Sequence, residues 1–498
     1  MYSKVNIITL LLFLGSFSTY GQLSSVEDSV ILGNTYQHPV AKQLHPLVGV
    51  GDVRFGYQNS SIPEELQFQS GNKISRVSFQ TEQIIHEKNW TYWGNATYQY
   101  DKRYGKYGSI LTEPWRLGPY QVTDTIGGNQ TLETYNLKGG VSKTIQNLEL
   151  GLEGGYNFSQ SYRRTDPRPR NNTSDVMIAL SSGYKIGNIM LGITGRYNVY
   201  KQKNQTRNYI PNRKDYIFLT QGIGNISESY TDNDGAFSID YQGYFWSGAL
   251  FFHTLGQKSS WRGNILVKVE NIEQRINLNK QRPYQYTPHL YQLEVGHTYK
   301  KSAWEWQSMA TASFHHNTGL ERRYKEILLD KEAYITDYIL ITELEKYKEQ
   351  YYDLQWQNII SYKKRKLHSW FKVNIGAYDH TIQNLSPNEY FKQQYIIPSL
   401  SLTQSLFIGR FKLGWNIGGE RKLFIQKDNK IDSKLHKVPH YAEGLQHKLE
   451  TAYSKYHLRM TWSYSLPKNK QVYINTNGFV WQTKKNYYSA QIILGLKL

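Results

Sequence analysis

The chain has no cysteine in 498 residues. This absence excludes disulfide bonds, thiolate metal sites, a cysteine nucleophile and the lipid-modified cysteine that anchors a lipoprotein. After the N-terminal region, no apolar run approaches the roughly 18 residues that a membrane-spanning helix needs. The mean hydropathy of −0.62 agrees with that absence. The sequence therefore excludes a disulfide-stapled domain and a helical membrane protein.

The first 21 residues have the pattern of a secretory signal peptide. Lys4 precedes an apolar run from Val5 to Leu14, and Thr19 and Gly21 are small enough for the positions that a signal peptidase reads. We expect cleavage after Gly21, so that the mature chain begins at Gln22 and is exported. Although a net charge of +19 could attract nucleic acid, export argues against such a partner.

Alternating strands account for most of the remaining chain. Residues 486–498 have one apolar row, which consists of Tyr488, Ala490, Ile492, Leu494, Leu496 and Leu498. Similar segments begin at Trp90, Leu148, Ile189, Trp261, Trp304 and Phe411. A period of two indicates strands with a different environment on each face. The 42 Tyr and 12 Trp residues suit aromatic belts at two water–lipid interfaces.

The connections between these strands differ in length. Short turns, such as those at 145–147 and 187–188, alternate with long polar connections at 102–133, 160–174, 202–236, 273–285, 317–348, 381–394 and 423–445. We therefore predict an all-β transmembrane antiparallel β-barrel of the outer-membrane type over 48–498. It should have about 18 strands (roughly 16 to 20), short periplasmic turns and long extracellular loops. A soluble sandwich is the competing fold, but it would need shorter strands and more uniform connections.

The stretch 22–47 between the signal peptide and the barrel is short. A TonB-dependent receptor carries a far larger plug domain, so the sequence does not fit that class. Two interpretations stay open. The stretch enters the lumen as a small hatch, as similar N-termini do in fatty-acid transport barrels, or it is a loose periplasmic lead-in.

Charged residues of both signs occupy the rows predicted to face the lumen. These lumen-lining candidates are Arg76, Glu82, Glu149, Glu153, Arg196, Arg262, Lys268, Glu270, Glu294, Glu305, Asp353, Lys412 and Glu420. A barrel of this size is wide enough to hold water or a plug. The row is either a polar path for a small solute, with charges that set ion preference, or part of a lumen filled by salt-bridged side chains and folded loops.

An arginine-rich segment, SYRRTDPRPR at 161–170, is predicted to lie in an extracellular loop. Its candidates for anion binding are Arg163, Arg164, Arg168 and Arg170. Guanidinium groups match the geometry of phosphates and carboxylates. Contact with lipopolysaccharide phosphates at the outer leaflet is the favoured interpretation, and capture of an anionic ligand or of a partner's acidic surface is the alternative.

The segment 318–352 has no clear helical or extended period. If it folds inward, it constricts the pore; if it projects, it offers an apolar surface to a partner.

We find no catalytic constellation in the sequence. His315 and His316 are the best candidates for a base, but Ser308 and Ser313 share no evident nucleophile geometry with them. Metal-binding and phosphate-binding motifs are also missing. We therefore predict no enzymatic activity, no cofactor and no metal site.

The signal peptide ending in GQ, the Tyr-rich strands through to IILGLKL and the lack of cysteine together resemble an uncharacterised family of outer-membrane β-barrel proteins from Bacteroidota. The resemblance covers nearly the whole chain, rests on architecture and transfers no functional residue. It implies a place in the outer membrane of a Gram-negative bacterium. It also implies an association with nutrient uptake, such as that of iron or haem, around TonB-dependent receptors.

Two functions follow as hypotheses. The leading one is a porin-like or transporter-like barrel that passes a small polar or amphipathic solute, or assists a receptor that does. The alternative is a plugged, non-conducting surface barrel whose loops bind a ligand or a protein. Expected partners are outer-membrane lipid and lipopolysaccharide, with a TonB-dependent receptor or a surface lipoprotein as further candidates.

Overall fold

Strands make up most of the part of the chain that the structure describes. The computed structural model describes residues 38–44, 51–124, 126–207, 209, 216–223, 225–231, 236–276, 281–330, 335–431, 439–467 and 470–498. Its strands are β1 (Gly51–Ser61), β2 (Lys73–Glu87), β3 (Trp90–Lys106), β4 (Val122–Asp124), β5 (Gly128–Ile145), β6 (Leu148–Arg163), β7 (Arg168–Ile186), β8 (Ile189–Arg207), β9 (Tyr216–Gln221), β10 (Asn225–Thr231), β11 (Ala236–Thr254), β12 (Ser259–Arg275), β13 (Tyr284–Lys301), β14 (Trp304–Asp330), β15 (Ile335–Lys364), β16 (Leu367–Leu385), β17 (Asn388–Ile408), β18 (Phe411–Arg421), β19 (Leu423–Lys430), β20 (Ser454–Ser465), β21 (Gln471–Gln482) and β22 (Asn486–Lys497). The helical elements are η2 (Pro39–Leu44), η3 (Glu64–Leu66), η4 (Pro114–Leu117) and α3 (Pro439–Glu450). Among the described residues, no helix is both long and apolar enough to cross a membrane.

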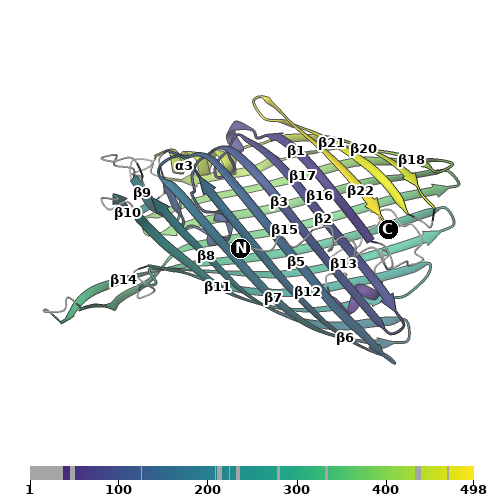
Figure 1. Cartoon of the computed structure of the whole chain (residues 1–498), viewed down its shortest axis with the longest axis horizontal. Helices are drawn as coiled ribbons and strands as arrows, with labels where there is room; N and C mark the ends of the chain where they lie inside the picture. Colours follow the sequence, from purple (N-terminus) through teal and green to yellow (C-terminus); the bar gives the residue numbers. More distant parts are fainter. Residues whose placement is uncertain are drawn as a thin grey trace, which may run out of the picture.

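The large sheet closes on itself as an antiparallel barrel (Figure 1). The last strand, β22, pairs with β1 in a ladder that runs from Asp52 opposite Lys497 to Ser60 opposite Ser489. β18 and β19 pair with successive parts of β17, so together they occupy one strand position in the wall. The nineteen strands of this sheet therefore form an 18-stranded barrel. The predicted fold and strand number are confirmed. Closure leaves no unpaired edge to face lipid.

The two ends of the barrel differ. At the turn end, where the C-terminus lies (right in Figure 1), tight turns connect the strands. Several of these turns begin with a residue of positive φ, and these residues are Lys88, Gln146, Gly187, Ser302, Arg365 and Gly409. Such turns match the twist of the flanking strands. At the opposite, loop end lie β9, β10 and α3 (Figure 1).

The wall separates an apolar outer row from a polar inner row. On β6, Leu150 and Leu152 are each 44% exposed, whereas Glu149 and Glu153, which flank them, are buried. Two aromatic belts flank the apolar band on β12 to β15. Near the loop end the belt contains Tyr291, Phe314 and Tyr352, and near the turn end it contains Trp261, Trp304, Trp306 and Tyr362. Exposed apolar side chains between aromatic belts are the pattern of a bilayer-facing surface.

Three connections predicted as long loops are wrong. Only residues 164–167 separate β6 from β7, and Ser386 and Pro387 alone separate β16 from β17. Of the segment 317–348, residues 317–330 belong to β14 and residues 335–348 belong to β15. Strands continue past the aromatic belt with polar side chains on both faces, so the end of the apolar alternation did not mark the end of the strand.

Candidate functional site

At the loop end of the lumen, chain folds inward and packs against the wall, and we call this chain the roof. It comprises 107–124, 216–223 and 225–231, whose strands β4, β9 and β10 form a small separate sheet. Apolar residues of the roof pack on inward residues of the wall in one buried cluster. It contains Ile110, Leu111, Leu117, Tyr120, Val122, Ile217, Leu219 and Ile223 from the roof and Tyr200, Ile239, Tyr241, Phe245, Ile272, Tyr284, Tyr286, Tyr347, Ile382 and Phe391 from the wall. The roof is therefore a hydrophobic core built inside the barrel mouth.

Charged groups attach the roof to the wall. The Lys106 ammonium donates to the Leu111 carbonyl at 2.6 Å and to Gln130 Oε1 at 2.9 Å. Arg116 donates to Asp175 at 2.8 Å and lies over the Tyr200 ring, with 4.1 Å between the guanidinium carbon and the ring centroid. Because each of these charges is paired or hydrogen-bonded, its burial is tolerated.

The predicted arginine cluster does not form one exposed surface. Arg163 is 6% exposed, and its guanidinium bonds Asp124 and the Pro167 carbonyl, so it fixes the roof. Arg168 donates to Asp166 at 2.6 Å and lies over the Tyr209 ring. Arg164 and Arg170 are exposed. The interpretation of Arg163 as an anion ligand is therefore wrong, because an internal carboxylate already occupies its guanidinium.

The turn end of the lumen holds a second, smaller closure, which we call the floor. It is η2 with the preceding His38, and it lies against the inner side of β3, β5, β6 and β7. Val40 and Ala41 are fully buried and pack with Met190 and Phe251. The Val40 N–H donates to Ser181 Oγ at 3.1 Å. Residues 38–44 thus lie inside the barrel, against its inner wall. The rest of the predicted 22–47 segment, like the signal peptide, falls outside the described residues.

The wall is shaped to receive the floor. A Cβ added at Gly151 would lie 2.8 Å from Pro39 Cβ, closer than such atoms approach, so the inner face of β6 needs glycine there. His38 stacks on Phe251 with ring centroids 4.3 Å apart. Its Nε2–H donates to Asn264 Oδ1 at 3.0 Å, and its Nδ1 accepts from the Thr194 hydroxyl at 2.8 Å. Both ring nitrogens are therefore used in the neutral state.

A charged cluster lies beside the floor. Glu153 is fully buried and accepts from the Trp93 indole at 3.0 Å, with the Lys138 ammonium at 3.0 Å and the Arg196 guanidinium at 3.6 Å. Lys42 brings another positive charge toward this cluster. Burial, together with Lys138 nearby, lowers the pKa of Lys42. The floor is therefore held by polar contacts and one small apolar cluster.

Most of the predicted lumen-lining residues are paired across the inner wall. Arg76 makes a bidentate pair with Asp101, at 2.8 and 2.9 Å. Glu149 accepts from the Thr144 hydroxyl at 2.6 Å. The remaining contacts are Lys268 with Glu270, Glu305 with Gln307, Asp353 with Gln355, Glu420 with Lys455, Lys412 over the Phe407 ring, and Arg262 with the Met309 sulfur. Glu294 is 2% exposed. The ion pair between Lys268 and Glu270 lies within strand β12, whereas the pair between Arg76 and Asp101 joins strands β2 and β3.

The sequence did not indicate a buried carboxylate on the opposite wall. Glu349 accepts from His380 Nε2 at 2.8 Å, from Asn317 at 2.9 Å and from the hydroxyls of Tyr347 and Tyr286 at 3.2 and 3.3 Å. The register of β13 to β16 brings these donors together. They are far apart in the sequence and have no fixed spacing, so only cross-strand pairing reveals the cluster.

The match to a known family covers the barrel and most of the floor. The family model described as "Family of unknown function (DUF6850)" matches residues 39–498. The chain belongs to this family. No curated protein matches it.

Solved structures that align with this family member are outer-membrane receptors and a transporter. The ferric preacinetobactin receptor BauA from Acinetobacter baumannii is 6% identical, with 90% of this chain and 80% of that chain covered and a TM-score of 0.38. The copper transporter OprC is 7% identical, with 89% and 80% covered and a TM-score of 0.41. The ferric-catecholate import receptor Fiu from E. coli K12 is 8% identical, with 90% and 81% covered and a TM-score of 0.39. At these values the likeness carries no argument about what this family member binds.

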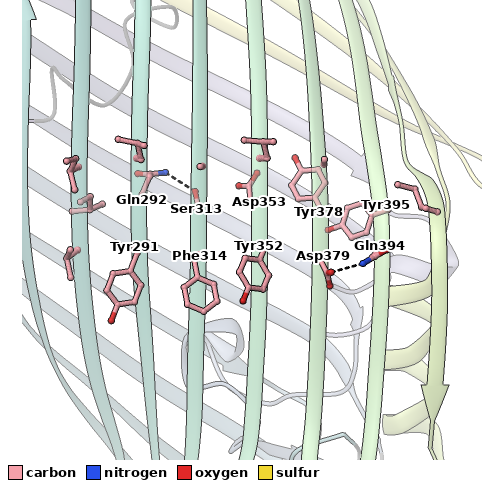
Figure 2. Close-up of a pocket in the computed structure, with 18 residues that line it drawn as sticks. Tyr291, Gln292, Ser313, Phe314, Tyr352, Asp353, Tyr378, Asp379, Gln394 and Tyr395 are labelled. Atoms are coloured by element: carbon pink, nitrogen blue, oxygen red, sulfur yellow. Dashed lines mark hydrogen bonds between the residues drawn. The ribbon is translucent and has the colours of Figure 1, made fainter.

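A hollow of about 600 Å³ lies at the wall formed by β12 to β17 and β19 (Figure 2). Figure 2 shows Tyr291, Phe314 and Tyr352 in one row across neighbouring strands. Its most exposed lining side chains are the bilayer-facing ones, such as Leu354 at 58%. The hollow therefore belongs to the lipid-facing surface and is separate from the lumen.

Proposed function

We propose that this protein is a gated uptake barrel of the Gram-negative outer membrane, with the turn end in the periplasm. The carrying observation is the floor, a short segment that is seated by few contacts at the turn end of the polar lumen. Wall charges of both signs suit a small polar or amphipathic solute. The family resemblance suggests a nutrient such as iron or haem, and a TonB-dependent receptor or surface lipoprotein as partner. Outer-membrane lipid and lipopolysaccharide would contact the apolar band.

The test compares two N-terminal deletions in planar bilayers. The mature chain and a variant lacking 22–44 are purified in detergent, and both are checked for a folded barrel by heat modifiability on gels. The matched control lacks only 22–37 and keeps the floor. We expect rare openings for the mature chain and the control, and a larger, steady conductance for the longer deletion. Equal silence of all three folded proteins would contradict the proposal.

A plugged surface barrel is the second candidate, and the roof favours it. A buried apolar cluster that joins loops to wall is expected to stay in place when the floor leaves. If the roof by itself blocks the path at the loop end, the 22–44 deletion would remain non-conducting, and function would lie in the exterior of the roof and loops. The same recordings therefore separate the two candidates.

A further inference from the structure

The roof and the floor contact the lumen wall unevenly. The floor lies against β3, β5, β6 and β7. The roof cluster includes Ile382 of β16 and Phe391 of β17, and both lie in the loop-end halves of their strands. Among the described residues, neither the roof cluster nor the floor cluster includes a side chain from the turn-end halves of β16, β17, β18 and β20.

A basic patch lies on this part of the wall and consists of Lys372, Ser401, Gly418, His457 and Arg459. The first four are consecutive cross-strand partners on β16, β17, β18 and β20, and Arg459 follows His457 by two residues toward the turn end. Only glycine fits at 418, because an added Cβ would lie 2.6 Å from His457 Cε1. The patch therefore carries positive groups on both sides and small residues between them.

The basic patch faces the lumen. On the same four strands, the side chains of the opposite phase are apolar and between 43% and 55% exposed, and they include Phe371, Leu400, Ile417 and Leu458. Because successive side chains of a strand point to opposite faces, the patch points into the barrel. Arg459 is exposed on that inner face, so water in the lumen reaches it.

The two long cations of the patch have unused donors. Among the described residues, none accepts a hydrogen bond from the Lys372 ammonium. Arg459 donates through Nε to Asn477 Oδ1 at 2.7 Å, and within the described part of the chain its two terminal nitrogens have no acceptor. Charges inside a protein are normally paired, so these donors suit a ligand of negative charge.

The positive charge of the patch is not neutralised by its own strands. No Asp or Glu occurs in the segments 367–376, 397–408, 411–419 and 454–465. Glu420, the next inward residue on β18 toward the loop end, lies 4.0 Å from the Lys455 ammonium. The charges of Arg459, Lys455 and Lys372 all act on the His457 ring. These cations therefore lie close enough to create one positive region, unlike Arg76, which Asp101 neutralises.

We propose that the basic patch binds the anionic oxygen group of a solute, a phosphate or a carboxylate. Lys372 binds it from β16 and Arg459 from β20. Three strand spacings, about 14 Å, separate these two strands, and the small residues between them let both long side chains contact one small solute. A guanidinium group matches the geometry of an oxyanion. The inference rests on the proposed uptake function and names the class of its substrate.

Equilibrium dialysis of the mature chain in detergent tests the proposal, with radiolabelled inorganic phosphate and radiolabelled succinate as separate probes at low ionic strength. We expect saturable binding of at least one probe, and the tighter of the two identifies the preferred group. Lys372→Gln and Arg459→Gln should each weaken binding by about 10-fold or more, because each removes a charge-assisted contact. Lys372→Arg keeps the charge and should retain most of the affinity.

Lys427→Gln is the matched control. It removes the same charge from the loop end of this wall, where Lys427 already donates to the Glu450 carbonyl at 2.7 Å, and it should leave binding unchanged. Heat modifiability verifies that every variant is folded. The proposal is overturned by a folded mature chain that binds neither probe, by full binding in the combined Lys372→Gln and Arg459→Gln variant, or by equal weakening in Lys427→Gln.

This test is separate from that of the proposed function, because dialysis needs no open channel. A barrel that binds the anion but never conducts contradicts the uptake function alone. A barrel that conducts but binds neither probe contradicts the anion site alone.

Discussion

Acidification is expected to release the floor through His38. Burial lowers the pKa of the seated His38 imidazole from 6.5 to about 4. The ring is 4% exposed and its nitrogens contact only neutral side chains, so a second proton would place a positive charge away from water. Arg196 opposes protonation and Glu153 favours it, and both effects are smaller than that of burial.

The direction and the size of this pH effect on floor release follow from the linkage between protonation and seating. A group whose pKa is depressed in the seated state stabilises that state fully above its free pKa, and the stabilisation is lost as the pH falls from 6.5 toward 4. With these values the release equilibrium at pH 5 exceeds that near neutrality by about 30-fold, or about 2 kcal/mol.

The assay is open probability in planar bilayers at pH 7.5 and pH 5, with identical salt on both sides. The mature chain should open far more often at the lower pH. His38→Gln keeps a polar side chain without a titrating ring, so its open probability should vary little over this range. If His38→Gln retained the full pH response, or if acid closed the wild-type channel, the assignment of the gate to His38 would be refuted.

Three further variants test the remaining closures. Gly151→Val should displace Pro39, at a cost of about 1 to 3 kcal/mol to floor seating, and raise conductance, whereas Gly154→Val on the outer face should not. Glu349→Ala removes the acceptor of four donors, so the barrel should lose more than about 3 kcal/mol of stability, measured by urea titration of its heat-modifiable band. Arg163→Met leaves the buried carboxylate of Asp124 without its ion-pair partner, which should cost about 3 to 5 kcal/mol of stability. The variant should make the 107–124 segment sensitive to protease, and unchanged resistance would argue against an anchoring role for Arg163.

The barrel was predictable because membrane strands obey a local rule. Alternation depends only on neighbours two residues apart, and residues 486–498 show it without interruption. The secondary structure of residues 318–352 could not be predicted, also for a local reason. Register shifts at Gly319/Leu320, Arg323/Tyr324 and Leu328/Asp330 move the phase repeatedly, and both faces of the β14–β15 hairpin carry exposed apolar groups.

The lumen contents could not be read from the sequence, since they depend on pairings between distant segments. The roof gave one local signal, the apolar residues Ile110, Leu111 and Leu117 within a connection expected to be solvated. The floor gave no comparable signal. Whether 38–44 enters the lumen is decided by Gly151 and Ser181 on the wall, which sequence alone does not bring near Val40.

The roof and the floor differ in how strongly their contacts hold them to the wall, and this difference indicates which of the two moves first. The roof shares an apolar cluster of eighteen buried residues with the wall, whereas the floor shares one of four, and hydrophobic stabilisation scales with the buried apolar area. The floor adds hydrogen bonds through His38 and Val40, and each contributes only about 1 kcal/mol net. Thermal or acid perturbation should therefore empty the turn end first while the roof stays in place. If the roof were the gate, acid and Gly151→Val would leave the conductance unchanged, and Arg163→Met would raise it.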